Sequence, residues 1–174
     1  AERTFRRLLT EAEGDRDTTL AAAVALERLY RALQNPRGLV DALRLRARHE
    51  TDPALQTSLL SQAAEILEDE VGDLAGAIEA QRGRLDLDAG DLDALRALAR
   101  LYERSSQWEE LVTTLRRQAA LVGDGDAQKQ LLVRAASVLE EKLAALPEAI
   151  ALYEEVLSSF GPDRAIHAAL ARLL

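Results

Sequence analysis

Residues 95–115 read LRALARLYERSSQWEELVTTL, and this stretch decides the fold. Its apolar residues recur at intervals of three and four, which is the spacing of one face of an α-helix. They lie on both sides of a polar turn at 105–107, at Leu95, Leu98, Leu101, Tyr102, Leu111 and Leu115. The stretch therefore predicts two amphipathic helices joined by a short turn.

The same hairpin pattern repeats with a period of 72 residues. Leu29-Tyr30 recurs as Leu101-Tyr102, and Ala77-Ile78 recurs as Ala149-Ile150. A fixed offset over most of a chain is the mark of a repeat array. Helices of about 12–15 residues are marginal alone, so their narrow apolar stripes must pack against neighbouring helices. We therefore expect an all-α fold in which each period holds two antiparallel hairpins.

The repeat predicts about ten helices in a single solenoid over residues 1–174. The expected hairpins span about 18–50, 53–88, 91–122 and 126–160, with half-repeats at 2–13 and 163–174. The last helix ends on apolar Leu170, Leu173 and Leu174, whereas a terminal repeat usually has a polar outer face. We therefore expect a fragment of a longer array.

Turn chemistry marks the helix ends. Asn35 and Asp52 each precede a proline and are expected N-caps. Ser106 and Glu109 have the spacing of a capping box. Gly83 lies inside an expected helix, where it indicates a close backbone approach. All four prolines are expected at helix starts, namely Pro36, Pro53, Pro147 and Pro162.

Composition limits the function. The net charge is −8 and the isoelectric point about 4.9, which argues against nucleic acid and anionic membrane surfaces as partners. No apolar run approaches the ~20 residues of a membrane span. The absence of cysteine excludes disulfides and thiol chemistry. The compartment stays open, with the cytoplasm slightly favoured.

No constellation predicts catalysis, a metal or a cofactor. His49 and His167 have no second ligand at metal-binding spacing. The acidic runs 86–93 and 124–126 lack the spacing of an EF-hand, and acidic residues at helix starts explain both. We therefore expect a protein that is not an enzyme.

The repeat resembles the tetratricopeptide repeat (TPR), whose pattern is Trp-x2-Leu-Gly-x2-Tyr, then Ala-x3-Phe, then Pro. The corresponding residues in this chain are Leu95-x2-Leu98-Ala99-x2-Tyr102, then Leu111-x3-Leu115. Glu27 departs from the pattern, because it replaces a small packing residue. The resemblance implies a right-handed αα-superhelix; a HEAT-like αα-solenoid is the structural alternative.

The resemblance also implies a concave groove, lined by the first helix of each hairpin, that holds a peptide or a partner segment. The groove residues that it implies are Arg28, Gln62, Glu65, Arg100, Arg104, Gln130, Arg134 and Arg172. The arginines could bind carboxylates of an acidic partner. Alternatively, they are solvated or paired with Glu65, Asp69 and Glu141.

Trp108 is the sole tryptophan. It is either a binding anchor or, as we expect, a residue packed between the helices of its hairpin. In the second case, Trp108→Ala should destabilise the fold by roughly 3–5 kcal/mol.

The resulting hypothesis is a non-enzymatic scaffold or adaptor that binds a protein or peptide. Two alternatives remain: a regulatory or substrate-recruiting segment of a larger enzyme, and a structural spacer without a ligand groove.

Overall fold

The computed structural model describes residues 15–174, and within that range every regular element is a helix. The half-repeat expected at 2–13 lies outside the described residues. The chain divides into two compact units, unit 1 at residues 1–89 and unit 2 at residues 90–174. A single continuous solenoid over both units stays a prediction.

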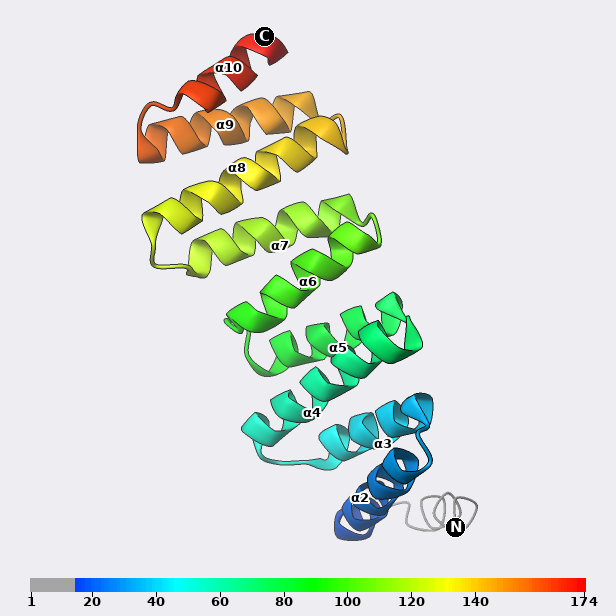
Figure 1. Cartoon of the computed structure of the whole chain (residues 1–174). Helices are drawn as coiled ribbons and strands as arrows, with labels where there is room; N and C mark the ends of the chain where they lie inside the picture. The colour runs from blue at the N-terminus through cyan, green and yellow to red at the C-terminus, as the bar shows by residue number, and fades with distance from the viewer. Residues whose placement is uncertain (1–14) are drawn as a thin grey trace. The chain divides into compact units, whose positions relative to one another are not determined.

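Unit 1 contains two helical hairpins in its described part (Figure 1). They are formed by α2 (Arg16–Ala32) and α3 (Pro36–His49), then by α4 (Pro53–Ile66) and α5 (Leu74–Leu87). A π-helical turn, η1 (Leu67–Val71), extends α4. Each helix packs on the next one in chain order.

Unit 2 has the same plan with one further helix (Figure 1). Its helices are α6 (Leu92–Arg104), α7 (Trp108–Leu121), α8 (Gly125–Glu141), α9 (Leu146–Phe160) and α10 (Arg164–Leu173). Here too each helix packs on its successor. The all-α class expected from the sequence is confirmed for residues 15–174.

The core of each unit is built from the expected stripes. In the stretch that opens the sequence analysis, the side chains of Leu95, Leu98, Leu101, Leu111 and Leu115 are at most 2% exposed. Alanines at the matched positions 63, 64, 135 and 136 are equally buried and let neighbouring helices approach closely. Burial of these stripes holds successive helices together.

Two expected N-caps are confirmed. The Asn35 side chain accepts a hydrogen bond from the Gly38 amide at 3.0 Å, and the Asp52 side chain accepts one from the Ala54 amide at 3.0 Å. Each cap satisfies an amide that has no partner within its own helix.

The capping box expected at Ser106 is wrong. Ser106 has a φ of 56°, and its amide donates to the Glu103 carbonyl at 3.2 Å, so this residue belongs to the end of α6. Gln107 is the N-cap of α7, and its side chain makes no capping hydrogen bond. The prediction for Pro162 is also inexact, because α10 starts two residues later, after the N-cap Asp163.

Trp108 is not a core residue. It is the first residue of α7 and is only partly buried, so it lies at the turn of the hairpin rather than between the two helices. The Lys142 amine lies 5.5 Å from the centre of its ring, within the range of a cation–π contact. We therefore expect Trp108→Ala to destabilise the fold by less than about 3–5 kcal/mol.

Gly83 lies inside α5, as expected. A Cβ atom at this position would stand 3.3 Å from Leu60 Cδ1. The close approach is therefore to a side chain of α4.

Candidate binding surface of the first helices

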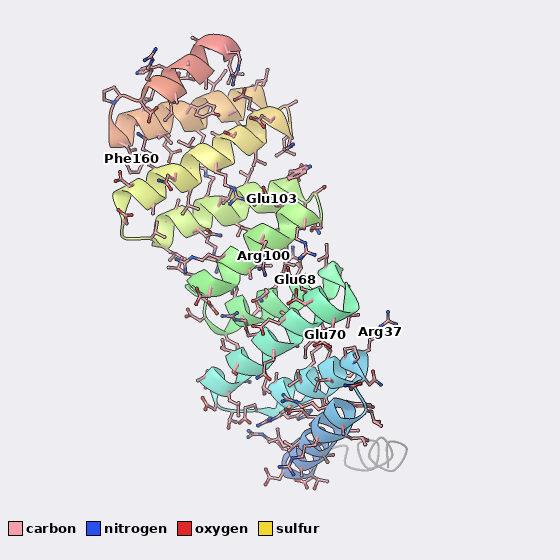
Figure 2. The ribbon with its side chains drawn as sticks, in the orientation of Figure 1. Arg37, Glu68, Glu70, Arg100, Glu103 and Phe160 are labelled. Atoms are coloured by element: carbon pink, nitrogen blue, oxygen red, sulfur yellow. The ribbon has the colours of Figure 1, made fainter. Side chains whose placement is uncertain are left out.

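The eight groove residues implied by the TPR resemblance all lie on the first helices of hairpins, on α2 and α4 in unit 1 and on α6, α8 and α10 in unit 2. Gln62 is partly exposed, and the other seven are exposed: Arg28, Glu65, Arg100, Arg104, Gln130, Arg134 and Arg172. Figure 2 labels Arg100 on α6, one turn before Glu103. We call the surface that these residues form within each unit its first-helix face.

Unit 2 has an open hollow of about 590 Å³ on this face, which we call the α8 hollow. Gln130, Arg134 and Ser137 line it. They follow one another at one-turn intervals, so they share one side of α8. Its other lining residues are Asp126, Lys129, Val133 and Asp163.

Asp163 closes one end of the α8 hollow. The Lys129 amine donates to the Asp163 carboxylate at 2.6 Å, and the same carboxylate accepts from the amides of Ala165 at 2.8 Å and Ile166 at 3.3 Å. The hydrogen bond from Lys129, followed by those from the two amides, lowers the pKa of Asp163 below its ordinary value. The carboxylate therefore stays ionised at neutral pH and ties the start of α10 to α8.

Ser137, in the wall of the hollow, is held by the buried residue Tyr153. Their hydroxyl oxygens are 3.3 Å apart, and the Tyr153 hydroxyl donates to the Glu140 carboxylate at 3.2 Å. Burial raises the pKa of Tyr153, so this hydroxyl keeps its proton well above neutral pH. The wall of the hollow is thus positioned by residues that pack behind it.

Arginines link successive first helices in unit 2. Arg134 on α8 donates to Glu103 on α6 at 2.8 Å, and Arg172 on α10 donates to Glu140 on α8 at 2.5 Å. Pairing with Glu141, one of the alternatives from the sequence, is not what the structure shows for these two arginines. Their partners are 31 and 32 residues earlier in the chain, about one hairpin away.

The two pairs differ in exposure. The side chains of Arg134 and Glu103 are 44% and 52% exposed, and those of Arg172 and Glu140 are 66% and 12% exposed. An exposed ion pair contributes only about 0–1 kcal/mol. The exposed Arg134–Glu103 pair therefore adds little to the stability of unit 2.

Unit 1 places its expected residues differently. Arg31, which was not expected, links α2 to Gln62 on α4 at 3.2 Å. Arg28 has no hydrogen bond or ion pair with the described residues. Glu65 accepts from the Ser61 hydroxyl at 3.3 Å. The structure thus brings Gln62 into a link between helices but does not gather these three residues into a hollow.

Sequence reasoning missed Lys129 and Asp163. The role of Asp163 as an N-cap could have been predicted from the repeat, because Asp163 stands 72 positions after Asp91. Each of these carboxylates caps the helix that follows it. Lys129 carried no such signal, since a lysine on an amphipathic helix gives no indication of its partner.

Metal and membrane features were searched for over residues 15–174. No group of three or more histidine, cysteine or acidic side chains in this range is arranged to hold a metal ion. No helix in this range is long and apolar enough to cross a bilayer. The acidic run at 124–126 begins α8, where Asp124 accepts from the amides of Asp126 and Ala127 at 3.3 Å each.

Comparison with known proteins identifies the fold. A crystal structure of the MamA protein superimposes with a TM-score of 0.50 at 19% identity, over 89% of this chain and 76% of that chain. A putative kinesin light chain from Podosopora anserina, with nearly identical TPR-like repeats, gives a TM-score of 0.51 at 17% identity, over 88% and 84% of the two chains. A MamA RS-1 double mutant gives 0.50 at 20% identity, over 92% and 84%.

No family model and no curated protein matches the sequence. The structural neighbours place the chain in the class of TPR-like helical-repeat folds. The TPR resemblance seen in the sequence is therefore confirmed at the level of the fold.

Proposed function

We propose that the chain is a protein-binding scaffold, and that unit 2 holds an acidic segment of a protein partner in the α8 hollow. The observation that carries the proposal is the hollow itself. It combines an exposed arginine, Arg134, with an exposed amide, Gln130, and a hydroxyl, Ser137, on one side of one helix. This set suits a peptide, because a guanidinium binds carboxylates and an amide side chain can pair with a peptide backbone.

The charge of the hollow favours an acidic side chain over a basic one at Arg134. Lys129 and Asp163 neutralise each other at 2.6 Å, and Asp163 is already saturated by Lys129 and two amides. Among residues 15–174, the ion-pair partner of Arg134 is Glu103, whose side chain is 52% exposed. A partner carboxylate that replaced Glu103 would release that side chain to water and form the same type of ion pair with Arg134 in the hollow.

The neighbouring structures support the proposal through their fold alone, because repeat arrays of this kind form extended surfaces suited to protein partners. A recruiting segment of a larger enzyme would use the same hollow. The spacer hypothesis differs, since it requires that no partner contact these residues.

A photo-crosslinking experiment tests the proposal. Benzoylphenylalanine at position 130 should crosslink a partner from the native source, and mass spectrometry should map the crosslink to an acidic segment. Arg134→Glu in the same protein should reduce that crosslink about tenfold, because it replaces attraction to a carboxylate with repulsion.

Arg116→Glu is the matched control. It makes the same charge change in unit 2 on the second helix α7, where Arg116 faces Glu155 at 3.7 Å. This variant should retain the crosslink, and circular dichroism should show both variants folded. An equal yield from Arg134→Glu and Arg116→Glu would contradict binding in the α8 hollow.

A further inference from the structure

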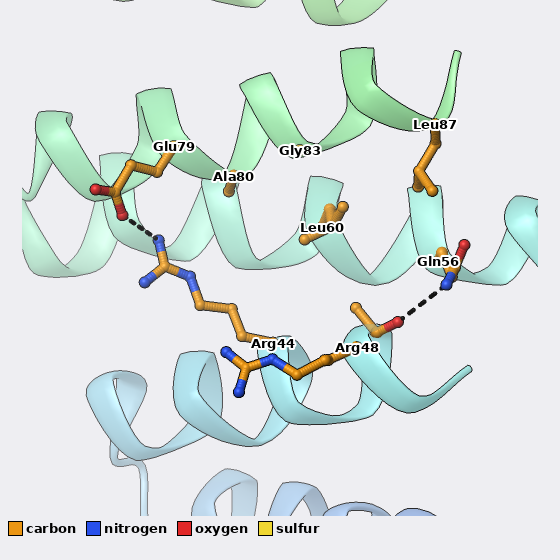
Figure 3. A pocket seen from close by; sticks show the side chains of 9 residues that line it. Arg44, Arg48, Gln56, Leu60, Glu79, Ala80, Gly83 and Leu87 are labelled. Atoms are coloured by element: carbon orange, nitrogen blue, oxygen red, sulfur yellow. Dashed lines mark hydrogen bonds and ion pairs between the residues drawn. The ribbon is translucent and has the colours of Figure 1, made fainter. Parts of the chain in front are cut away.

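Unit 1 has a hollow whose lining includes none of the residues of its first-helix face. It has a volume of about 420 Å³ and is bounded by α3, α4 and α5, and we call it the α3–α5 hollow (Figure 3). Leu60, Ala80 and Gly83 form its apolar part, and Leu87 stands at one end, 40% exposed. Arg44 and Arg48 project from α3 on the other side (Figure 3).

The matched positions of unit 2 carry larger side chains than those of the α3–α5 hollow. At the positions 72 residues later, unit 2 has Leu152 in place of Ala80 and Glu155 in place of Gly83. Leu152 is 2% exposed, and Glu155 faces Arg116 at 3.7 Å. Arg116 is itself the counterpart of Arg44. Unit 2 therefore supplies a branched aliphatic side chain and a carboxylate where unit 1 has the two smallest residues.

From this difference we infer that the α3–α5 hollow is a binding site for a protein segment that presents a branched aliphatic side chain next to a carboxylate. The aliphatic group packs on Leu60 beside Gly83, and the carboxylate meets Arg48. The partner thus provides the aliphatic group that Leu152 provides in unit 2, and its carboxylate binds Arg48, whose matched position in unit 2 is Ala120.

The polar side of the hollow fits an anion. Arg44 donates to the Gly76 carbonyl at 2.8 Å and lies 3.8 Å from Glu79, whose side chain is 75% exposed. Arg48 is exposed and has no hydrogen bond or ion pair with the described residues. Glu79 is the one acidic side chain in the lining, and it faces Arg44 rather than Arg48. Arg48 therefore remains able to bind an incoming carboxylate.

The apolar side depends on Gly83. Any side chain at this position would begin with a Cβ atom 3.3 Å from Leu60 Cδ1 and would extend into the hollow. Glycine is unfavourable in the interior of a helix, because it has no side chain to pack and loses more backbone freedom on folding than any other residue. Glycine at position 83 therefore leaves the volume beside Leu60 open.

The simplest probe is 4-methylpentanoate, which carries a leucine-like group and a carboxylate in one small molecule. In the full chain, it should cause saturable NMR shifts of the methyl groups of Leu60, Ala80 and Leu87, with a Kd on the order of 10 mM, as its size allows. The uncharged analogue 4-methylpentan-1-ol should bind at least about fivefold more weakly, because it cannot pair with Arg48.

Two variants convert the hollow to the arrangement of unit 2. Ala80→Leu combined with Gly83→Glu should abolish the shifts by filling the space. Arg48→Ala, which introduces the residue found at the matched position Ala120, should weaken binding of the acid at least threefold and leave the alcohol unchanged. Arg37→Ala, on the same helix outside the hollow, should change neither.

Different results test the existence of the site and the role of Arg48. Shifts that fail to saturate, or that persist in the filled double variant, overturn the site. Equal affinity for acid and alcohol overturns the role of Arg48. If the double variant does not fold, Arg48→Ala decides. None of these results bears on the α8 hollow, which shares no residue with this site.

Discussion

The first hairpins of the two units bury the same interface in different ways. In unit 1, Glu27 lies between α2 and α3 and accepts from Arg46 at 3.0 Å. At the matched positions unit 2 has Ala99 and Gln118. The amide of Gln118 donates to the Leu95 carbonyl at 2.8 Å.

The two units also distribute side-chain volume differently along the first helix of this hairpin. Unit 1 pairs Ala23 with the larger Glu27, whereas unit 2 pairs the larger Leu95 with Ala99 one turn later. All of these except Glu27 are at most 4% exposed. One bulky and one small side chain fill the space in either order, so the repeat conserves total volume rather than the residue at each position. This explains how Glu27 replaces the small residue of the TPR pattern.

The Glu27–Arg46 arrangement of unit 1 should be more sensitive to a single substitution than the Ala99–Gln118 arrangement of unit 2. The side chains of Glu27 and Arg46 are 14% and 24% exposed, and Glu27 has a second partner in Arg31 at 2.9 Å. This pair is partly buried. Removing one partner of such a pair leaves the other with less compensation, whereas replacing both together can be nearly neutral.

The largest effect should therefore come from Arg46→Gln, which we expect to lower the free energy of unfolding by about 1–3 kcal/mol. Glu27→Ala with Arg46→Gln, which copies unit 2, should recover most of that loss. Urea denaturation followed by circular dichroism measures both. Arg37→Gln, on exposed α3 surface, is the control and should change stability by less than about 0.5 kcal/mol. A single variant as stable as the wild type would show that Arg31 alone satisfies Glu27.

Much of the fold was predictable because the period of 72 residues and the apolar stripes are local properties of the sequence. They placed the helices of both units, and they placed caps such as Asn35 and Asp52. The link between Glu27 and Arg46 was not predictable. Both positions differ from their counterparts in unit 2, but so do many others, and two copies of a repeat do not show which changes are paired.

The polar details of the candidate sites were less predictable. The TPR resemblance placed Gln130 and Arg134 on the correct helix, but the pairing of Arg134 with Glu103 depends on how α6 and α8 are rotated about their axes. Sequence spacing does not determine that rotation. The α3–α5 hollow had a partial signal in Gly83, whose meaning appeared only when Leu60 and Arg48 were placed around it.

Trp108 extends the comparison to the start of the second helix, where unit 1 has Pro36 at the matched position. Because the tryptophan is partly exposed and its clearest polar contact is Lys142, we expect Trp108→Ala to lower the free energy of unfolding by about 1–2 kcal/mol. Chemical denaturation measures it. Lys142→Met serves as the control for the cation–π part, and should account for less than about 1 kcal/mol. If Trp108→Ala lowered the free energy of unfolding by about 3 kcal/mol or more, Trp108 would instead be a core residue.

The smallest expected change in stability concerns the turn within the second hairpin of each unit. Gly72 and Ala144 occupy matched positions, and both adopt left-handed backbone, with φ values of 73° and 51°. Glycine reaches this region without strain, whereas a residue with a Cβ atom does so at a cost of roughly 1 kcal/mol.

Ala144→Gly should therefore stabilise unit 2 by about 0.5–1 kcal/mol, and Gly72→Ala should destabilise unit 1 by a similar amount. The second change has no steric component, since no atom lies within 4 Å of the Cβ that it adds. Urea midpoints measure both. Ala151→Gly, on an exposed site inside α9, is the control with the opposite sign and should cost about 1 kcal/mol. If Ala144→Gly were destabilising like this control, backbone strain at the turn would not distinguish the two units, and their difference would rest on side-chain packing alone.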